Sequence, residues 1–239
     1  MDYAGRVAKA DTYPKLLRLN AREHGSEIAL REKDLGLWRV FTWNDYQTRV
    51  HDFALGMVEL GLTRGDVIGV IGDNRPDWVA AEIATHAIGG MSLGLYRDVL
   101  DEEAAYLLSY GEAKLVFAED EEQVDKLLEI REQCPQLTHI YYDDPRGLRK
   151  YDEPCLASLD ELLAAGKAFN GLHPEYYAAE INKAQPDDVG AMFFTSGTTG
   201  NAKGVVHTHN SLLNRARVGA DFDKLTGADE VLAYLPPAW

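Results

Sequence analysis

The spacing of apolar residues changes several times along the chain. Between Asn44 and Leu60 they recur three and four positions apart, which predicts an amphipathic helix, and Gly61 stands where a glycine ends a helix. The run from Val67 to Val70 is apolar on both faces and predicts a buried strand. Further helices are expected over 76–87, 102–110 and 121–132, alternating with strands over 91–95, 115–118 and 138–141. The alternation predicts an α/β fold with a mainly parallel sheet flanked by helices.

The rest of the chain is less regular. A helix is expected to begin at Thr12, and the polar link 33–36 between two short apolar runs predicts a hairpin. From 143 to 186 the pattern weakens, and we expect a surface excursion with short helical pieces such as 159–163. Strands over 189–194 and 204–207, a helix over 211–222 and a last strand over 231–235 complete the prediction.

Charge and composition exclude several classes of protein. In 239 residues, 24 Lys and Arg stand against 39 Asp and Glu, a net charge of −15. Nucleic-acid binding needs a basic footprint, and an anionic membrane surface repels so acidic a chain unless a local basic patch intervenes. The apolar share of 46% is ordinary for a globular protein and too high for a disordered one. We therefore expect a folded protein that does not bind nucleic acid.

Cysteine usage and the apolar runs indicate where the protein resides. The two cysteines, Cys134 and Cys155, form neither a CxxC pair nor a Cys/His array, which disfavours a disulfide framework and a zinc module. The N-terminus lacks the layout of a signal peptide, and the uncharged stretch 83–96 is too short to span a bilayer. These features favour a cytoplasmic protein without a transmembrane segment.

One segment combines the residue types that phosphate binding needs. The apolar run 191–194 is followed by Thr195-Ser196-Gly197-Thr198-Thr199-Gly200-Asn201-Ala202-Lys203-Gly204. Glycines let backbone N–H groups turn toward one anion, the hydroxyl groups add donors, and Lys203 supplies a mobile positive charge. The spacing is not that of the Walker A motif, the dinucleotide-binding fingerprint or the serine-hydrolase elbow. The segment thus predicts a phosphate-binding loop of another kind.

This loop resembles the signature phosphate loop of the adenylate-forming superfamily, which includes acyl-CoA synthetases, peptide-synthetase adenylation domains and luciferases. The length and order of the match disfavour a chance glycine-rich turn. The similarity continues along nearly the whole chain in Gly65-Asp66-Val67, Asn74-Arg75-Pro76-Asp77-Trp78, Gly89-Gly90 and Leu235-Pro236-Pro237-Ala238-Trp239. Two further segments, 96–98 and 143–148, look most like those of bacterial long-chain fatty-acid–CoA ligases.

The resemblance implies a ligase reaction in two steps. A carboxylate attacks the α-phosphate of ATP to give an acyl adenylate and pyrophosphate, and coenzyme A then takes the acyl group as a thioester. By the same resemblance, Thr195 helps to hold Mg²⁺, the residues from Ser196 to Gly200 wrap the β and γ phosphates, and Lys203, followed by Gly204, is the catalytic residue that stabilises them. Trp239 matches a position near the acyl pocket. ATP, Mg²⁺ and coenzyme A are the cofactors implied, with a fatty acid as substrate.

The resemblance also implies that the chain is one part of a longer enzyme. Residues 1–239 are expected to be the N-terminal part of the large adenylation domain, without the small C-terminal domain, because the family's later Mg²⁺, ribose and lysine motifs would follow Trp239. Ala202 stands where the family commonly has proline, so one backbone dihedral of the loop is less restricted. We expect this fragment alone to be inactive. An aryl or amino-acid adenylating enzyme and a non-catalytic interaction module are the alternatives, and a homodimer and peripheral membrane contact through the lipid substrate stay open.

Four smaller features allow both a functional and a structural interpretation. His207 and His209 would suit a metal pair, but no third ligand is evident and packing is favoured. The acidic run 119–122 fits a solvated helix start better than a cation site, and the run 74–77 fits a helix cap better than a substrate contact. The aromatic residues Trp38, Trp43, Trp78, Tyr141 and Tyr142 are interpreted as core.

Overall fold

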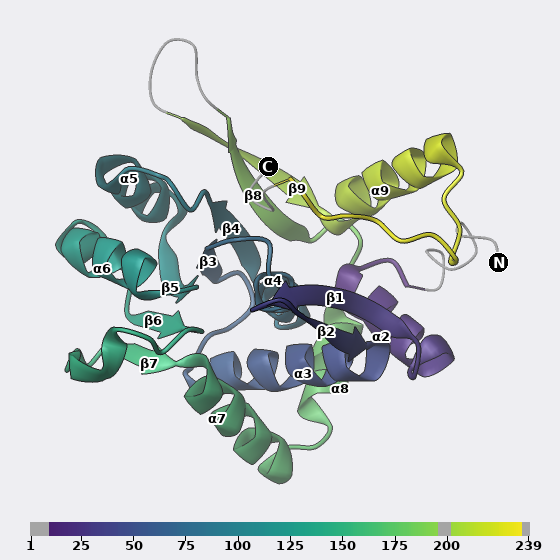
Figure 1. The fold of residues 1–239 in the computed structure, drawn as a ribbon, viewed down its shortest axis with the longest axis horizontal. Coiled ribbons are helices and arrows are strands. Elements are labelled where there is room, and N and C mark those ends of the chain that lie inside the picture. Colours follow the sequence, from purple (N-terminus) through teal and green to yellow (C-terminus); the bar gives the residue numbers. More distant parts are fainter. Residues whose placement is uncertain (1–9, 196–201, 236–239) are drawn as a thin grey trace.

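The computed structural model of the protein describes residues 10–195 and 202–235. Within these ranges a seven-stranded sheet has the strand order β7-β6-β5-β3-β4-β8-β9 (Figure 1). Its strands are β3 (Val67–Ile71), β4 (Met91–Leu95), β5 (Ala113–Ala118), β6 (His139–Tyr142), β7 (Leu156–Ser158), β8 (Val189–Thr195) and β9 (Lys203–Thr208). Neighbouring strands are parallel except β8 and β9, which are antiparallel. The prediction of an α/β fold with a mainly parallel sheet is confirmed.

Helices cover both faces of this sheet. They are α2 (Tyr13–His24), α3 (Trp43–Glu59), α4 (Pro76–Ala87), α5 (Asp101–Gly111), α6 (Glu121–Ile130), α7 (Leu159–Leu172), α8 (Tyr176–Lys183) and α9 (His209–Asp223), with 3₁₀ turns η1 (Arg131–Gln133) and η2 (Leu148–Lys150). One buried cluster gathers residues of α2, α3, α4, α7 and α8, and a second gathers those of α5 and α6. In the described ranges, no helix has both the length and the apolar composition needed to cross a bilayer.

Strand β3 shows why its sequence has no polar position. Ile68 and Val70 belong to the first cluster, whereas Val67 and Ile71 belong to the second. Successive side chains of a strand point to opposite faces, so a strand between two helical layers needs an apolar residue at every position. The helix predicted over 76–87 and the strand over 91–95 match α4 and β4 at both ends.

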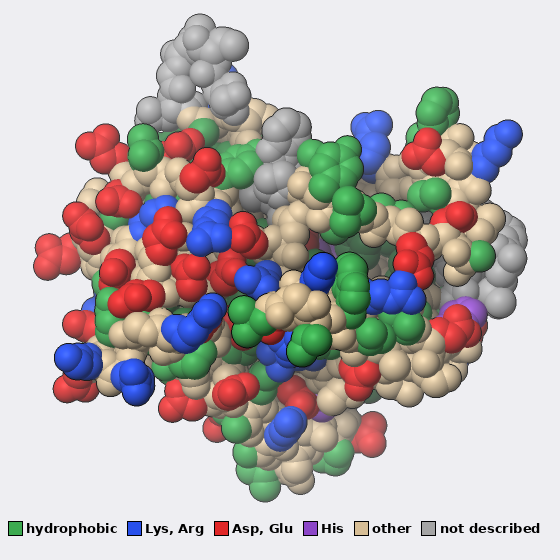
Figure 2. Space-filling view, in the orientation of Figure 1, with side chains coloured by type: hydrophobic (Ala, Val, Ile, Leu, Met, Phe, Trp, Pro, Cys, Tyr) green, Lys and Arg blue, Asp and Glu red, His purple; other side chains and the backbone are tan. Residues whose placement is uncertain are grey.

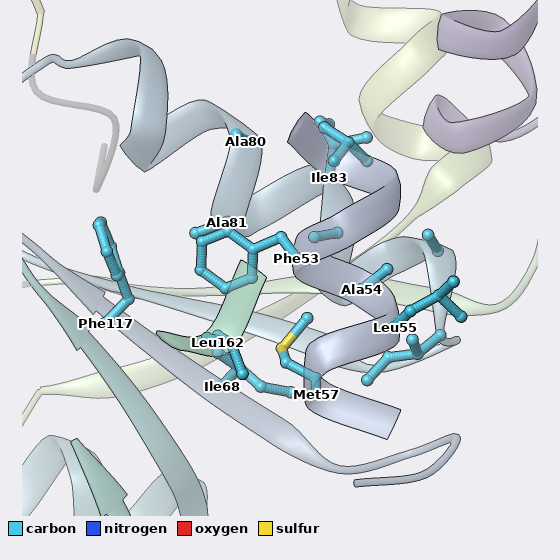
Figure 3. Packing of buried hydrophobic residues seen from close by; sticks show 14 of the residues in the cluster. Phe53, Ala54, Leu55, Met57, Ile68, Ala80, Ala81, Ile83, Phe117 and Leu162 are labelled. Carbon is cyan, nitrogen blue, oxygen red and sulfur yellow. The ribbon is translucent and has the colours of Figure 1, made fainter. Parts of the chain in front are cut away.

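The first cluster is built around α3. Phe53 and Phe117 meet edge to face with ring centroids 5.6 Å apart, and Figure 3 shows Phe53 directed toward β5. Two glycines bring α3 and α7 together. A Cβ on Gly56 would lie 2.3 Å from the carbonyl oxygen of Leu162, and one on Gly166 would lie 1.9 Å from that of Asp52. The two helix backbones are therefore in direct contact.

Two expectations for the less regular segments are wrong. Residues 143–186 are not a surface excursion, because β7 pairs with β6 in the sheet and α7 buries Leu159, Leu162 and Leu163. The strand expected over 231–235 is absent from the described residues, where that segment has no regular structure. Apolar residues make a strand only where another strand pairs with them, and in the described part of the chain none pairs with this segment.

The predicted N-terminal hairpin is confirmed as β1 (Ile28–Asp34) and β2 (Leu37–Thr42), which form a separate antiparallel sheet. Its turn consists of Leu35 and Gly36, with φ of 46° and 84°, the positive values that suit the twist of a two-residue hairpin. Trp38 on this hairpin is 65% exposed, so its assignment to the core is wrong, whereas Trp78 is buried as expected.

Candidate functional site

The β8–β9 hairpin carries the described residues of the predicted phosphate loop. Thr195 ends β8 and Lys203 begins β9, and the two are register partners in the antiparallel pair. The Thr195 Oγ1 atom lies 3.5 Å from the carbonyl oxygen of Lys203. Both residues are exposed, and Figure 1 shows the hairpin extending beyond the helical layers. A hydroxyl group and an ammonium group thus lie at the two ends of the segment that joins these strands.

Helix α5 supports the end of this hairpin that carries Thr195 and Lys203. The Tyr106 hydroxyl donates a hydrogen bond to the carbonyl oxygen of Ala202 at 3.1 Å, and the Tyr110 ring meets Phe194 edge to face at 5.9 Å. Gly204 leaves room for this packing, because a Cβ there would lie 2.9 Å from the sulfur of Met192 and 3.3 Å from the Tyr110 ring. The strand ends that hold Thr195 and Lys203 are therefore anchored from one side.

The structure places only some of the predicted site residues. Thr195, Lys203 and Gly204 lie together at the hairpin, whereas Ser196, Gly197, Thr198, Thr199, Gly200 and Trp239 lie outside the described residues. The Thr195 hydroxyl is a hard oxygen ligand of the kind that Mg²⁺ accepts, beside waters and substrate phosphates. Among residues 10–195 and 202–235, no group of three or more His, Cys, Asp or Glu side chains is arranged to hold a metal. The Thr195 hydroxyl is thus compatible with the role in Mg²⁺ binding that the sequence predicts, and that role stays a prediction.

A charged network that the sequence pattern does not reveal lies at the carboxyl ends of β3 and β5. The buried Glu119 carboxylate accepts hydrogen bonds from the Asp73 backbone N–H at 2.6 Å and from Arg75 Nε at 2.8 Å. Arg75 Nη1 also donates to Glu32 at 2.8 Å, and these bonds to Glu32 and Glu119 raise the pKa of Arg75. From β3 the chain passes first to β4 and then back across to β5, so the network occupies a point where the strand order reverses.

The acidic run 119–122 therefore has two roles. Asp120 caps α6 by accepting the Gln123 N–H at 3.3 Å, and Glu122 is exposed, as a solvated helix start predicts. For Glu119 that interpretation is wrong, because its carboxylate is buried in the network. The sequence feature that indicates burial of Glu119 is its position directly after the buried strand 113–118. Figure 2 shows many exposed acidic side chains over α5 and α6.

The helix-cap interpretation of 74–77 holds only in part. Pro76 occupies the first turn of α4, but the residue at the cap position is Arg75, which makes no side-chain cap bond. The Asn74 side chain instead donates to the carbonyl oxygens of Ala233 and Leu235. Asn74 therefore contacts a distant segment and does not cap α4.

His207 and His209 point to different surroundings. His207 Nδ1 lies 3.3 Å from the Ser211 hydroxyl, while His209 is buried with its ring centroid 5.1 Å from that of His86. Burial lowers the pKa of His209 to about 4 and that of His86 to about 3. Both buried imidazoles are therefore neutral at physiological pH, and His209 packs as an uncharged ring.

A comparison with known protein families gives a match over residues 17–239, to the family described as AMP-binding enzyme. The chain belongs to this family. Among curated members, the long-chain-fatty-acid–CoA ligase ACSBG2 of Xenopus laevis is 28% identical over 232 residues, which cover 94% of this chain and 30% of that ligase. The AMP-binding chain thus spans about 30% of the length of the first curated relatives it matches.

The fold of this chain is similar to that of solved structures. Acetoacetyl-CoA synthetase from Streptomyces lividans superposes with a TM-score of 0.76 at 21% identity, over 95% of this chain and 35% of that one. The anthranilate CoA ligase AuaEII, solved in complex with anthranoyl-AMP, superposes with a TM-score of 0.65 at 19% identity, over 87% of this chain and 36% of that one. The resemblance inferred from the loop is therefore confirmed at the level of family and fold.

Proposed function

We propose that this chain is the N-terminal part of the large adenylation domain of an ATP-dependent acyl-CoA synthetase that acts on long-chain fatty acids. The complete enzyme would join the carboxylate to the α-phosphate of ATP, release pyrophosphate and pass the acyl group to coenzyme A. The observation that carries the proposal is the β8–β9 hairpin, where Thr195 and Lys203 flank the sequence Ser196 to Gly200. Family membership and the name of the Xenopus laevis relative support the reaction and the substrate class.

The chemistry explains why such a hairpin is needed. Two anions, the carboxylate and ATP, must approach each other on a chain whose own net charge is −15. The Lys203 ammonium would stabilise negative charge on the β and γ phosphates, and backbone N–H groups between Thr195 and Lys203 would add donors. Mg²⁺, with the Thr195 hydroxyl among its ligands, would lower the charge on the leaving pyrophosphate. The local positive charge thus opposes the field of the whole chain.

Pyrophosphate release by the full-length gene product tests this proposal. With ATP, Mg²⁺ and coenzyme A, we expect release with long-chain fatty acids and far less with aryl or amino acids. Lys203→Ala should lower kcat/KM for ATP by roughly 100-fold, because a charged stabiliser of the transition state is lost. Lys33→Ala is the matched control, since Lys33 is also an exposed lysine on a strand. Wild-type protein that releases no pyrophosphate with any acid would overturn the proposal, as would full activity of Lys203→Ala.

We also propose a cytoplasmic enzyme that meets membranes peripherally, through its lipid substrate, and that forms a homodimer. The absence of a membrane-crossing helix from the described residues is compatible with this location. Carbonate extraction of cell membranes should release the full-length protein, and light scattering should give twice the mass of one chain. Protein that stays in the membrane pellet would contradict the location, and a monomer mass would contradict the dimer.

A further inference from the structure

An open hollow of about 380 Å³ lies between α5 and the 3₁₀ turn η1. Small-molecule sites in proteins have volumes from roughly 300 Å³ upward. Residues of these two elements form its wall: Glu102, Ala105, Tyr106, Ser109, Tyr110 and Gln133. Glu102, Tyr106 and Tyr110 follow one another at intervals of four residues, so they form one stripe along the helix. The hollow thus combines two aromatic rings with a carboxylate.

The β8–β9 hairpin holds both tyrosine rings in place. Their centroids lie 5.7 Å apart, with the ring planes at 33°. The Tyr106 hydroxyl is bonded to the carbonyl oxygen of Ala202, and the Tyr110 ring packs against Phe194. Tyr110 is nevertheless 56% exposed. A ring that is both fixed and accessible loses little conformational freedom when a ligand binds to it.

The surroundings of the hollow are acidic. α5 carries Asp101, Glu102 and Glu103 without any lysine or arginine, and α6 has four acidic residues and one lysine. η1 adds Arg131 and Glu132, whose charges cancel. Figure 2 shows acidic side chains over both helices. The exposed Glu102 side chain has neither an ion-pair partner nor a hydrogen-bond partner among the described residues, so its charge is available to a cation.

We propose that this hollow binds a small ligand through a guanidinium group. A guanidinium is planar, so it stacks on an aromatic ring, and its paired N–H groups match the two oxygens of a carboxylate. The group lies beside Glu102 and Tyr106, which are one helical turn apart. An apolar stem of about 6 Å, the rise of four helical residues, then extends over Tyr110. The site is separate from Thr195 and Lys203, and the inference does not depend on the proposed function.

Calorimetric titration of the full-length protein with butylguanidinium chloride tests the proposal. This probe has the charged group and a stem of the required length, and butylurea is its uncharged isostere. We expect saturable binding of butylguanidinium at millimolar concentrations that weakens as salt is added, and at least about tenfold weaker binding of butylurea. Equal binding of the two probes, or no saturable binding of butylguanidinium, overturns the proposal.

Two adjacent exposed glutamates distinguish the hollow from the acidic surface as a whole. Glu102→Gln should weaken butylguanidinium binding by about threefold or more. Glu103→Gln removes the same charge from a residue outside the wall of the hollow and should change binding by less than about twofold. Equal effects of the two substitutions overturn the proposal, because the probe would then bind to the acidic surface in general.

Two substitutions of Tyr110 test the role of the ring. Tyr110→Leu removes the ring and should weaken binding by about threefold or more, whereas Tyr110→Phe keeps the ring face and should stay within about twofold of the wild type. Circular dichroism shows whether each variant is folded, and Glu102→Gln decides the question if Tyr110→Leu is not. Wild-type affinity in a folded Tyr110→Leu variant overturns the proposal. Neither nucleotide nor fatty acid is present, so failure of the proposed function leaves the result unchanged.

Discussion

His86 and His209 meet edge to face inside the protein, with ring centroids 5.1 Å apart and ring planes at 86°. His86 lies on α4, and His209 is the first residue of α9, the helix that directly follows the β8–β9 hairpin. The pair therefore joins the end of the hairpin to the helical layer on the sheet. Both rings are almost completely buried, which lowers the pKa of each well below the ordinary value of 6.5.

We expect His209→Gln to make the protein less sensitive to acid. Below pH 6.5 the unfolded chain takes up a proton at each histidine, while the buried imidazoles, with pKa values of about 3 and about 4, stay neutral. The unfolded state is thus favoured as pH falls, by roughly 2 kcal/mol for each histidine between pH 7 and pH 5. Neighbouring charges also act on the pKa of His209: Asp188 and Asp11 raise it, whereas Lys15 and Arg64 lower it.

Urea unfolding at pH 7 and pH 5 measures this effect. The loss of unfolding free energy on acidification should be smaller in His209→Gln than in the wild type by roughly 2 kcal/mol. The exposed His173→Gln should leave the loss unchanged and serves as the control. An equal loss in the wild type and in His209→Gln would show that His209 is protonated in the folded protein.

Glu82 acts on stability in the opposite direction. Burial raises its pKa to about 7, and its carboxylate lies 3.5 Å from the Ser92 hydroxyl, which in turn lies 3.2 Å from His86 Nε2. The folded protein therefore binds a proton at Glu82 that the unfolded chain, with an ordinary pKa near 4.5, releases. This contribution to stability grows as pH falls from 7 toward 4.5 and partly cancels the loss caused by the histidines.

Glu82→Gln should therefore make the acid sensitivity larger. Without the carboxyl group, the unfolding free energy should drop more steeply between pH 7 and pH 5, by roughly 2 kcal/mol. Glu59→Gln is the control, because Glu59 is exposed on α3 and should not alter the profile. A profile of Glu82→Gln that parallels the wild type would mean that Glu82 is already ionised in the folded protein at pH 5.

The helices and strands that can be predicted from sequence are those in which the pattern of apolar residues itself shows which positions are buried. β3 is apolar at every position, and α3 repeats apolar residues on one face and ends beside Gly61, which has a φ of 87°. The full length of α7 is not evident from sequence, because its tight contact with α3 depends on Gly166, and a glycine carries no hydrophobic signal. The exposure of Trp38 is not evident from sequence either, because the apolar residues of a strand do not show whether another layer covers it.

In the candidate site, too, features contained in one stretch of sequence can be predicted, whereas contacts between distant residues cannot. The phosphate loop is one continuous stretch, so its residue order was sufficient to indicate the family. Glu119, Asn74 and His86 act through partners far along the chain, and their contacts exist only after folding. For Glu119 and Asn74 the sequence suggests a local role, a helix start and a helix cap, whereas the structure shows long-range contacts.

The contact of α3 with α7 can be tested with two glycines on the same helix. Gly166→Ala would place a Cβ 1.9 Å from the carbonyl oxygen of Asp52, whereas Gly171 has no atom within 4 Å of the corresponding position. We expect Gly166→Ala to lower the free energy of unfolding by about 2–3 kcal/mol, because backbone atoms cannot move aside cheaply. Gly171→Ala should be neutral or stabilising by up to about 1 kcal/mol. Equal urea midpoints for the two variants would contradict the close packing of these helices.

The acidic run at the start of α6 also allows a buried residue, Glu119, to be compared by substitution with an exposed one, Glu122. Glu119→Gln replaces a buried acceptor of two hydrogen bonds by an amide, which can no longer accept from both Asp73 N–H and Arg75 Nε without turning its own NH₂ group toward a donor. Arg75 would keep Glu32 as its partner at 2.8 Å. We expect a loss of roughly 2 kcal/mol or more in unfolding free energy, the cost of a buried donor left without its charged acceptor.

Glu122→Gln removes the same charge from an exposed carboxylate that lies 3.5 Å from Arg97. Its effect should stay within about 0.5 kcal/mol, as for most exposed ion pairs. Urea unfolding of the two variants at one pH separates the roles, because total charge changes equally in both. Since Glu119 also holds the loop that carries Asn74, Glu119→Gln should in addition increase the mobility of a spin label at Leu232→Cys, and Glu122→Gln should not. Equal stabilities and equal label mobilities would mean that Glu119 is a solvated charge at a helix start, as its sequence context alone suggests.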